Sequence, residues 1–277
     1  FWVEYVLPHS FGFLKRLRKR LGSVPIVADT DSVYSRFILR ELPYIQNPFR
    51  YLYVWLCGKF AQAVEERMLR DADVVTAVSD VDQEHFKSLL LDQSKVKRFS
   101  NVIDLNEYQQ TSKKELCLPR PNIILMGSFG HSNSPMDRAS KWLLDEIMPL
   151  VWEKKPEVNV VIIGRNSEHS QVVNSQNRVL VVGTVKSVVP YLQQADLTVV
   201  PLGHESGTRF KIIESGALAL PCVSTTLGAE GLAVEDEKNI IIADTTKDFA
   251  ISVVDLLNDD KKSEALGRAL NVLVSQD

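Results

Sequence analysis

From about residue 122 onward, short apolar runs alternate with longer segments whose apolar residues recur at helical spacing. The runs are continuous and rich in β-branched residues, which is typical of strands buried on both faces of a parallel sheet. They occupy 122–127, 158–164, 178–183, 197–202, 221–226 and 239–244. The segment 137–155 places Trp142, Ile147 and Val151 at helical spacing. This alternation predicts βαβ units around a parallel sheet.

The first hundred residues show the same kinds of pattern with less regular spacing. The runs 24–29, 73–79 and 96–103 have the composition of strands, and 50–70 has a long helical pattern. Within that helix we expect Tyr51, Trp55 and their neighbours to belong to the core rather than to a sugar-binding platform. A second α/β unit is therefore predicted in this half.

These patterns predict an α/β protein of two domains. Residues 1–110 form the first, 111–120 a polar linker, and 121–277 the second. Two such lobes with their strand ends facing inward form a cleft, which is the usual place for a ligand.

The two ends of the sequence are unusual for a whole protein. Residue 1 is Phe rather than Met, residues 1–6 already have a strand pattern, and the chain stops just past a helical pattern. We interpret the sequence as an internal piece of a longer chain, or as its ordered part, with an incomplete first domain.

Composition narrows the class of protein. The length of 277 residues is typical of two domains, and the net charge of −3 argues against a dedicated nucleic-acid binder. Cys57, Cys117 and Cys222 have neither disulfide nor metal-ligand spacing, which favours a reducing cytoplasm. No apolar run approaches the roughly 18 residues of a membrane span, and no signal peptide is visible.

The segment 204–217, HESGTRFKIIESGA, carries the strongest chemical signal. A helix beginning near Thr208 would present free backbone N–H groups and the positive end of its dipole to the preceding turn. Gly207 lets an anion approach the backbone closely. Arg209 and Lys211 add positive charge where the dipole disfavours it, so a bound diphosphate is expected. Glu214, one turn further on, is placed to accept hydrogen bonds from ribose hydroxyls.

A purely structural interpretation of this segment stays open. In that case Ser206, Gly207 and Thr208 form only an N-cap, and the charges lie on a solvated face. The turn follows a predicted buried strand and carries misplaced cations, which favours the anion site.

Residues 201–232 resemble the donor-binding signature of the retaining group 1 glycosyltransferases, family four. Residues 127–164 and 179–202 resemble earlier parts of the same domain, and 77–86 and 100–108 more loosely resemble the end of the first domain. The resemblance implies two facing Rossmann-like domains, the GT-B architecture. It also implies a nucleotide-diphosphate sugar as donor, a glycan or lipid-linked acceptor on the N-terminal side, and transfer of a hexose-type sugar with retention.

The resemblance also assigns residues to roles. Arg209 and Lys211 would hold the diphosphate and support catalysis, and Glu214 the ribose. The backbone of Gly127 and Ser128 would face the phosphates. The turn of Gly183, Thr184 and Val185 would meet the base. Turns between strands and helices need glycine in any case, so a structural role for both turns stays open.

Three positions depart from the family pattern. Glu205 and Glu214 are separated by one residue more than the family's pair of glutamates, and Ser206 occupies the expected place. Glu205 remains a candidate for the sugar hydroxyls. Asp31 stands where the family often has His. It either binds hydroxyls, together with Asp29, or ends a strand in a turn. The loop after the first strand of the second domain lacks Arg and Lys; Arg138 and Lys141 come later, on the expected helix.

No Asp-x-Asp cluster in the second half suggests a metal bridging the diphosphate, so no cofactor or metal is expected. The histidines lack metal spacing, and His131 and His204 are weak site candidates. The cationic segment 13–21 carries Leu14, Leu17 and Leu21 on one helical face. It would either lie on an anionic membrane surface near a lipid-linked acceptor or pack its leucines into the core.

The favoured function is a nucleotide-sugar-dependent hexosyltransferase of polysaccharide or glycolipid biosynthesis. It would act in the cytoplasm, with peripheral contact at the inner face of the membrane as an option and no nucleic-acid partner. Two alternatives stay open: a sugar-nucleotide epimerase of the same two-domain plan, and a nucleotide-sugar-binding module that has lost catalysis.

Overall fold

The computed structural model describes residues 2–4, 13–109, 116–130, 134–169, 178–205 and 210–276. The chain forms two compact units. The first is Phe1–Val102 together with His204, Glu205 and Glu230–Leu232, and the second contains the remaining described residues. Residues 111–115 of the expected linker 111–120 lie outside the described residues.

The first unit is built on a four-stranded parallel sheet whose strands follow one another in sequence order, β1-β2-β3-β4. The strands are β1 (Trp2–Glu4), β2 (Val27–Asp29), β3 (Val74–Ala77) and β4 (Val96–Arg98). The last three lie inside the predicted runs and are shorter than them. Right-handed crossovers between strands in this order place the connecting helices on one face of the sheet.

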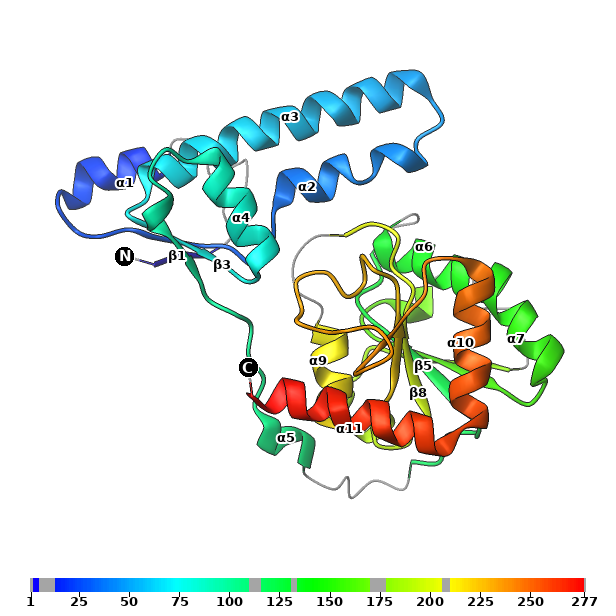
Figure 1. The fold of residues 1–277 in the computed structure, drawn as a ribbon. Helices are drawn as coiled ribbons and strands as arrows, with labels where there is room; N and C mark the ends of the chain where they lie inside the picture. Colours follow the sequence, from blue (N-terminus) through cyan, green and yellow to red (C-terminus); the bar gives the residue numbers. More distant parts are fainter. Residues whose placement is uncertain are drawn as a thin grey trace. The chain divides into compact units, whose positions relative to one another are not determined.

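Among the described residues of this unit, six helical segments connect these strands or follow them; the helices among them are labelled in Figure 1. They are α1 (Phe13–Leu21), α2 (Tyr34–Leu39), η2 (Leu42–Tyr44), α3 (Pro48–Asp71), α4 (Asp80–Leu89) and η3 (Gln93–Lys95). Sequence signals explain where the longest of them begins. Asn47 caps α3 by accepting hydrogen bonds from the N–H groups of Phe49 and Arg50, and Pro48 occupies its first turn.

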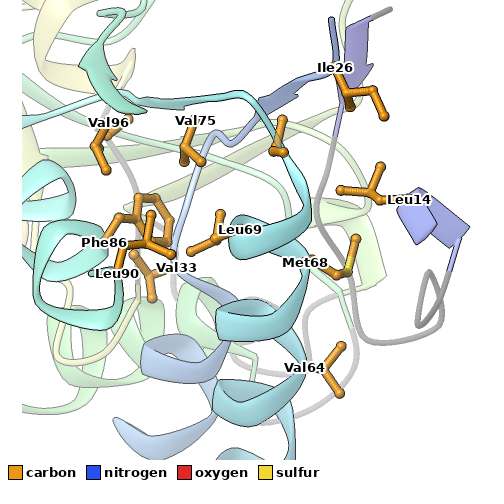
Figure 2. Close-up of a cluster of buried hydrophobic side chains, with 13 residues drawn as sticks. Leu14, Ile26, Val33, Val64, Met68, Leu69, Val75, Phe86, Leu90 and Val96 are labelled. Atoms are coloured by element: carbon orange, nitrogen blue, oxygen red, sulfur yellow. The ribbon is translucent and has the colours of Figure 1, made fainter. Parts of the chain in front are cut away.

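Helices α1, α3 and α4 share one hydrophobic core with the sheet (Figure 2). Leu14 of α1, Met68 of α3 and Phe86 of α4 are each at most 2% exposed in this core. Leu17 packs partly against it. Leu14 and Leu17 of the cationic helix α1 therefore contribute to the fold.

The prediction that the aromatic residues near the start of α3 lie in the core is wrong. Tyr51 is 45% exposed and Trp55 is 40% exposed. The C-terminal half of α3 packs on the sheet, whereas its N-terminal half packs against α2. There a side-chain Cβ on Gly58 would lie 2.4 Å from Leu39, so the two helices approach closely along a narrow strip. The strip covers one side of the helix only.

A carboxylate is buried where α3 passes the start of α2. The Glu65 residue is 3% exposed, and its Oε1 accepts a hydrogen bond of 3.0 Å from the N–H of Ser35. Burial raises the pKa of the Glu65 carboxyl, and the hydrogen bonds from Ser35 only partly oppose this.

We expect Glu65→Gln to stabilise the protein relative to wild type at neutral pH, with the advantage fading as the pH falls through the raised pKa of the folded protein and gone once the pH is below 4.5, the carboxyl's ordinary pKa. The folded protein holds this proton more tightly than the unfolded chain does. The resulting stability is full below the unfolded pKa and is lost as the pH rises through the folded pKa. Gln keeps the acceptor for Ser35 but carries no charge. Urea unfolding of both proteins across this range measures the difference; a Gln variant that loses most stability at neutral pH would contradict the assignment.

The second unit contains a six-stranded parallel sheet in the order β10-β9-β8-β5-β6-β7. Its strands are β5 (Asn122–Met126), β6 (Asn159–Ile163), β7 (Val179–Gly183), β8 (Leu197–Val200), β9 (Cys222–Ser224) and β10 (Ile241–Ile242). Each lies within one of the six predicted runs, so the prediction of a parallel sheet is confirmed. The chain builds outward from β5 through β6 to β7, then returns to β8 on the other side of β5.

Helices cover both faces of this sheet, with α6, α7 and α10 on one face and α9 and α11 on the other (Figure 1). The helical segments are α5 (Leu105–Gln109), α6 (Pro135–Trp142), the π-helical η4 (Leu143–Ile147), α7 (Met148–Lys154), η5 (Ser167–His169), α8 (Val189–Leu192), α9 (Phe210–Ala217), α10 (Thr246–Asn258) and α11 (Asp260–Gln276). The helix predicted over 137–155 is formed by α6, η4 and α7. The π turn precedes Pro149, which has no N–H for an α-helical bond.

None of the helices within the described ranges is both long and apolar enough to cross a membrane.

Candidate functional site

The topology of the second sheet identifies one edge as the place for a ligand. Strand β5 pairs with β6 on one side and β8 on the other, so the strand order reverses beside β5. Open parallel sheets bind ligands outside the carboxyl ends of the strands at such a switch point. Gly127 and Ser128 directly follow β5, and the connection from β8 leads into α9. Two of the sequence-predicted segments are thus brought to this edge.

The turns after β5 and β6 pack backbone against backbone. The N–H of Gly127 donates to the carbonyl of Ile163 at 3.0 Å, and the N–H of Phe129 donates to the carbonyl of Arg165 at 2.8 Å. Gly164 has a φ of +135°, and a Cβ there would lie 1.8 Å from the Gly127 carbonyl oxygen. Only glycine fits at position 164, so this contact fixes the path of the Gly127–Ser128 backbone.

The turn after β7 joins the same edge. The carbonyl of Gly183 accepts a hydrogen bond of 3.0 Å from the N–H of Gly164. The exposed Thr184 accepts one of 3.3 Å from the N–H of Asn166 through its Oγ1. Val185 packs partly against the hydrophobic core on one face of the sheet. The structure thus brings two predicted segments to one edge of the sheet: the turn at Gly183, predicted to meet the base, and the turn at Gly127, predicted to face the phosphates.

Helix α9 places Lys211 and Glu214 one turn apart, on neighbouring positions of its surface. The Glu214 Oε1 accepts a hydrogen bond of 2.9 Å from the hydroxyl of Tyr108, which lies on α5. Burial raises the pKa of the Glu214 carboxyl, and the Tyr108 hydrogen bond and the Lys211 charge oppose that rise. Burial also raises the pKa of the Tyr108 hydroxyl, and the charge of Glu214 adds to this.

Tyr108 is a site residue that the sequence did not reveal. Its ring is buried, and its backbone carbonyl accepts a hydrogen bond of 3.4 Å from Gln193. The partners Tyr108 and Glu214 are about a hundred residues apart in sequence. No local pattern signals such a pair.

Several predicted residues fall outside the described ranges: Ser206, Gly207, Thr208, Arg209 and His131. Their assignments stay predictions from the sequence.

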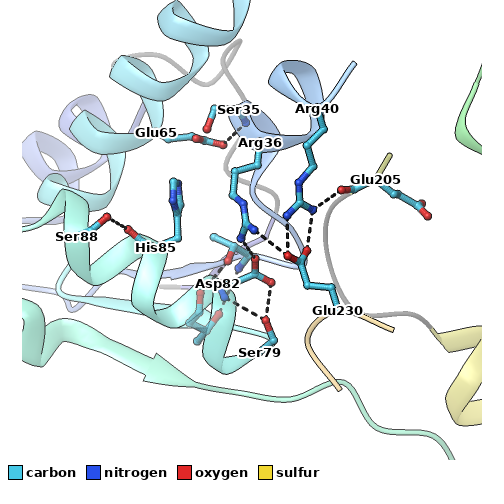
Figure 3. Close-up of polar contacts among 12 residues, drawn as sticks. Ser35, Arg36, Arg40, Glu65, Ser79, Asp82, His85, Ser88, Glu205 and Glu230 are labelled. Atoms are coloured by element: carbon cyan, nitrogen blue, oxygen red, sulfur yellow. Dashed lines mark hydrogen bonds and ion pairs between the residues drawn. The ribbon is translucent and has the colours of Figure 1, made fainter. Parts of the chain in front are cut away.

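In the first unit, Arg40 holds Glu205 and Glu230 (Figure 3). Its guanidinium donates to both carboxylate oxygens of Glu230, each at 2.7 Å, and to the Glu205 backbone carbonyl at 2.6 Å. Arg36 lies one turn earlier on α2 and bridges Glu230 at 3.0 Å and Asp82 at 3.3 Å. Forked, partly buried pairs of this kind are stronger than exposed ones.

The cluster bears on the predicted role of Glu205. The hydrogen bond from Arg40 fixes the backbone of Glu205, immediately before the predicted anion-binding turn. Arg36 and Arg40 are four residues apart, a spacing at which like charges repel unless they share an anion. That spacing is visible in the sequence, but Glu230 as the shared anion is not.

The first unit also contains Asp29 and Asp31. Asp29 accepts a hydrogen bond from the hydroxyl of Thr76 on the neighbouring strand. Asp31 is exposed and accepts one of 3.2 Å from the Ser32 hydroxyl, while partial burial raises the pKa of its carboxyl. Asp29 therefore has a structural partner, and Asp31 remains accessible for a ligand hydroxyl.

His204 is 4% exposed, and its ring packs between those of Phe37 and Tyr44, with centroid distances of 6.5 and 5.2 Å. This packing assigns it to the fold of the first unit. Arg138 and Lys141 lie on α6 as expected, and Lys141 pairs with Asp137 at 3.0 Å. Among the described residues, no three His, Cys, Asp or Glu side chains are grouped so that they could hold a metal ion.

Solved structures of three proteins share the fold at low sequence identity. A mutant of TarM from S. aureus, in complex with fondaparinux, α-GlcNAc-glycerol and UDP, aligns with a TM-score of 0.70 and 14% identity, over 98% of this chain and 51% of TarM. HepE from Anabaena, in complex with UDP-glucose, aligns with a TM-score of 0.67 and 13% identity, over 99% of this chain and 74% of HepE. Sucrose-phosphate synthase from Thermosynechococcus elongatus aligns with a TM-score of 0.71 and 14% identity, over 99% of this chain and 68% of the synthase chain.

The chain spans about half the length of TarM. These likenesses confirm the expected fold class, α/β with Rossmann-like domains of the GT-B kind. No curated protein matches the sequence. The family model for group 1 glycosyl transferases matches residues 120–259, which contain the second sheet, the turns at its carboxyl edge and α9. Since this match covers just over half of the chain, the protein belongs to the group 1 glycosyl transferases.

Proposed function

We propose that the protein transfers a hexose-type sugar from a nucleotide-diphosphate sugar, with retention of configuration. The donor lies at the carboxyl edge of the second sheet. The observation that carries this proposal is the position of Lys211 and Glu214 on α9, the helix that follows β8, which pairs with β5 at the switch point of a group 1 family domain.

The chemistry requires stabilisation of the leaving diphosphate, on which negative charge develops as the glycosidic bond breaks. Arg209, Lys211 and the N-terminal end of α9 supply positive charge and dipole at this place. Glu214 accepts hydrogen bonds from the ribose. The backbone of Gly127 and Ser128 faces the phosphates, and the turn at Gly183 meets the base. We propose that no metal ion is needed.

The acceptor is a glycan or a lipid-linked glycan, on the side of the first unit, with Asp31 and Glu205 as the candidate residues for contacts to its hydroxyl groups. The structures of TarM and HepE, with UDP and UDP-glucose, make UDP-hexoses the first donors to try. The reaction would take place in the cytoplasm, where the three unpaired cysteines remain reduced. The cationic helix α1 would touch the inner membrane face near a lipid-linked acceptor.

We expect Glu214→Gln to weaken binding of free nucleoside diphosphate and of nucleotide sugar equally, by about 1–2 kcal/mol, because a charged acceptor for the ribose becomes neutral. Calorimetry with both ligands measures the two losses. Tyr108→Phe is the companion variant, since it removes the donor that orients Glu214 but keeps the ring; we expect a smaller loss of the same kind. A loss of affinity for the nucleotide sugar alone would indicate that Glu214 binds the sugar rather than the ribose.

Product analysis tests the proposal against its alternatives. A labelled nucleotide hexose is incubated with the protein and a mixture of glycan and lipid-linked acceptors. Label in the acceptor supports the transferase, and the anomeric configuration of the product decides retention. An isomerised nucleotide sugar would indicate an epimerase. Ligand binding, seen as a shift in thermal unfolding, with neither product would indicate a binding module.

A further inference from the structure

The N-terminal half of α3 carries a row of exposed apolar side chains. Its members, here called the apolar stripe, are Phe49, Leu52, Tyr53, Leu56 and Phe60, with exposed fractions of 84%, 54%, 68%, 52% and 63%. The last four lie three, four, seven and eleven residues after Phe49, which places all five along one side of the helix. The stripe extends over roughly 17 Å of helix.

The stripe lies opposite the side by which α3 packs into the first unit. The buried residues of this helix, among them Val54, Gly58 and Ala61, point about half a turn away from it. The first half of α3 is therefore apolar on both sides. Helices of this composition are normally enclosed on all sides, and contiguous exposed apolar surface marks an interaction site. The fold of the first unit does not use the stripe.

Positive charge borders the stripe at Lys59. Arg70 continues along the same side of α3 toward the C-terminal end, where it forms an ion pair with Glu66. At that end α1 packs beside α3, with the Arg18 side chain hydrogen-bonded to the Asp71 carbonyl at 3.5 Å. Helix α1 contains no acidic residue. Because both helices cover the same face of the sheet, their outer sides point the same way.

The two helices supply complementary halves of a membrane-binding surface. Leu14 of α1 is buried and Leu17 is partly buried in the core, so these two leucines are not available for insertion. The exposed cations of α1 are Lys15, Arg16, Lys19 and Arg20. Basic residues near an anionic surface attract it, but stable attachment needs a second, apolar contribution. The stripe provides this contribution.

We propose that the apolar stripe of α3 inserts into the interfacial region of an anionic lipid bilayer, with the cations of α1 and α3 against the headgroups. The aromatic residues Phe49, Tyr53 and Phe60 suit the boundary between acyl chains and headgroups. A second copy of the chain is the competing occupant, but pairing two copies through this side would bring like charges together. The inference extends the membrane contact proposed for α1 and does not depend on glycosyl transfer.

Co-sedimentation of the 277-residue chain with vesicles tests the proposal without donor or acceptor, so its failure and a failure of the transferase assignment are distinguishable. We expect binding to phosphatidylcholine vesicles that contain phosphatidylglycerol, and much weaker binding to pure phosphatidylcholine. Leu56→Ser combined with Phe60→Ser should lower the partition coefficient about ten-fold or more, because two apolar side chains lose their burial. Lys15→Glu combined with Lys19→Glu should also weaken binding. The binding that remains should depend less on salt concentration than the binding of wild type does.

Leu91→Ser is the matched control, since Leu91 is 99% exposed in the same unit but lies outside the stripe. It should bind vesicles like wild type. Only variants whose thermal unfolding midpoint equals that of wild type are compared. If the double serine variant does not fold, Tyr53→Ser replaces it. Wild type that ignores anionic vesicles, or stripe variants that bind as well as wild type, overturn the proposal. So does a lipid-free dimer, measured by sedimentation equilibrium, that the stripe variants dissociate.

Discussion

Gly164→Ala should destabilise the second unit by about 2–5 kcal/mol, a lowering of the unfolding midpoint by roughly 5–15 °C. Two effects add. The backbone at Gly164 has a φ of +135°, which L-residues rarely adopt. The new Cβ would also lie 1.8 Å from the Gly127 carbonyl oxygen, inside any possible contact distance, so one of the two turns must move.

Calorimetric unfolding measures the loss, and Gly130→Ala is its control. Gly130 follows β5, as Gly127 does, but a Cβ there would lie 3.6 Å from the Ser134 Cβ, an ordinary contact. Its φ is also outside the left-handed region. The control should unfold within a few degrees of wild type. If Gly164→Ala has the same unfolding midpoint as the control, the two turns are less tightly packed than their backbone contact indicates.

Arg209→Ala should weaken binding of a nucleoside diphosphate by about ten- to a hundred-fold, because hydrogen bonds to charged groups contribute roughly 1.5–3 kcal/mol. Arg209→Lys should restore only part of the affinity, since a forked donor becomes a point charge. The prediction rests on the sequence, in which Arg209 precedes α9 directly.

Arg268→Ala is the matched control, because it also removes one positive charge from the protein. Arg268 lies on α11 with its side chain 74% exposed and pairs with Glu264 within the same helix. Its removal should leave diphosphate binding unchanged at moderate salt. Equal losses from Arg209→Ala and Arg268→Ala would mean that net charge, rather than a specific contact, sets the affinity.

The sequence predicted the second sheet well because strands buried on both faces are continuous apolar runs, a signal that needs no knowledge of distant residues. It failed at Tyr51 and Trp55 because an aromatic residue in a helical pattern indicates an apolar side but not what covers it. In the first half of α3 the apolar side exists, but the fold of the first unit does not cover it. The helical pattern of 137–155 likewise did not reveal that a π turn would precede Pro149.

The candidate site was predicted in part for the same reason. Lys211 and Glu214 are close in sequence, so their common position on α9 followed from helical spacing alone. The support of Glu214 by Tyr108, and of Glu205 and Glu230 by Arg40, joins residues that are far apart in the chain. Such contacts depend on the tertiary fold, and one sequence contains no pattern that reveals them.

The most direct test of the donor site is a calorimetric titration of the chain with UDP-glucose, GDP-glucose and ADP-glucose, each with and without EDTA. The account predicts saturable binding of at least one of them, with the same affinity in both buffers, because the diphosphate is held by Arg209, Lys211 and backbone N–H groups. Absence of saturable binding for all three would contradict a nucleotide-sugar site at the carboxyl edge of the second sheet. Binding that disappears in EDTA would contradict a site that holds the diphosphate without a metal ion.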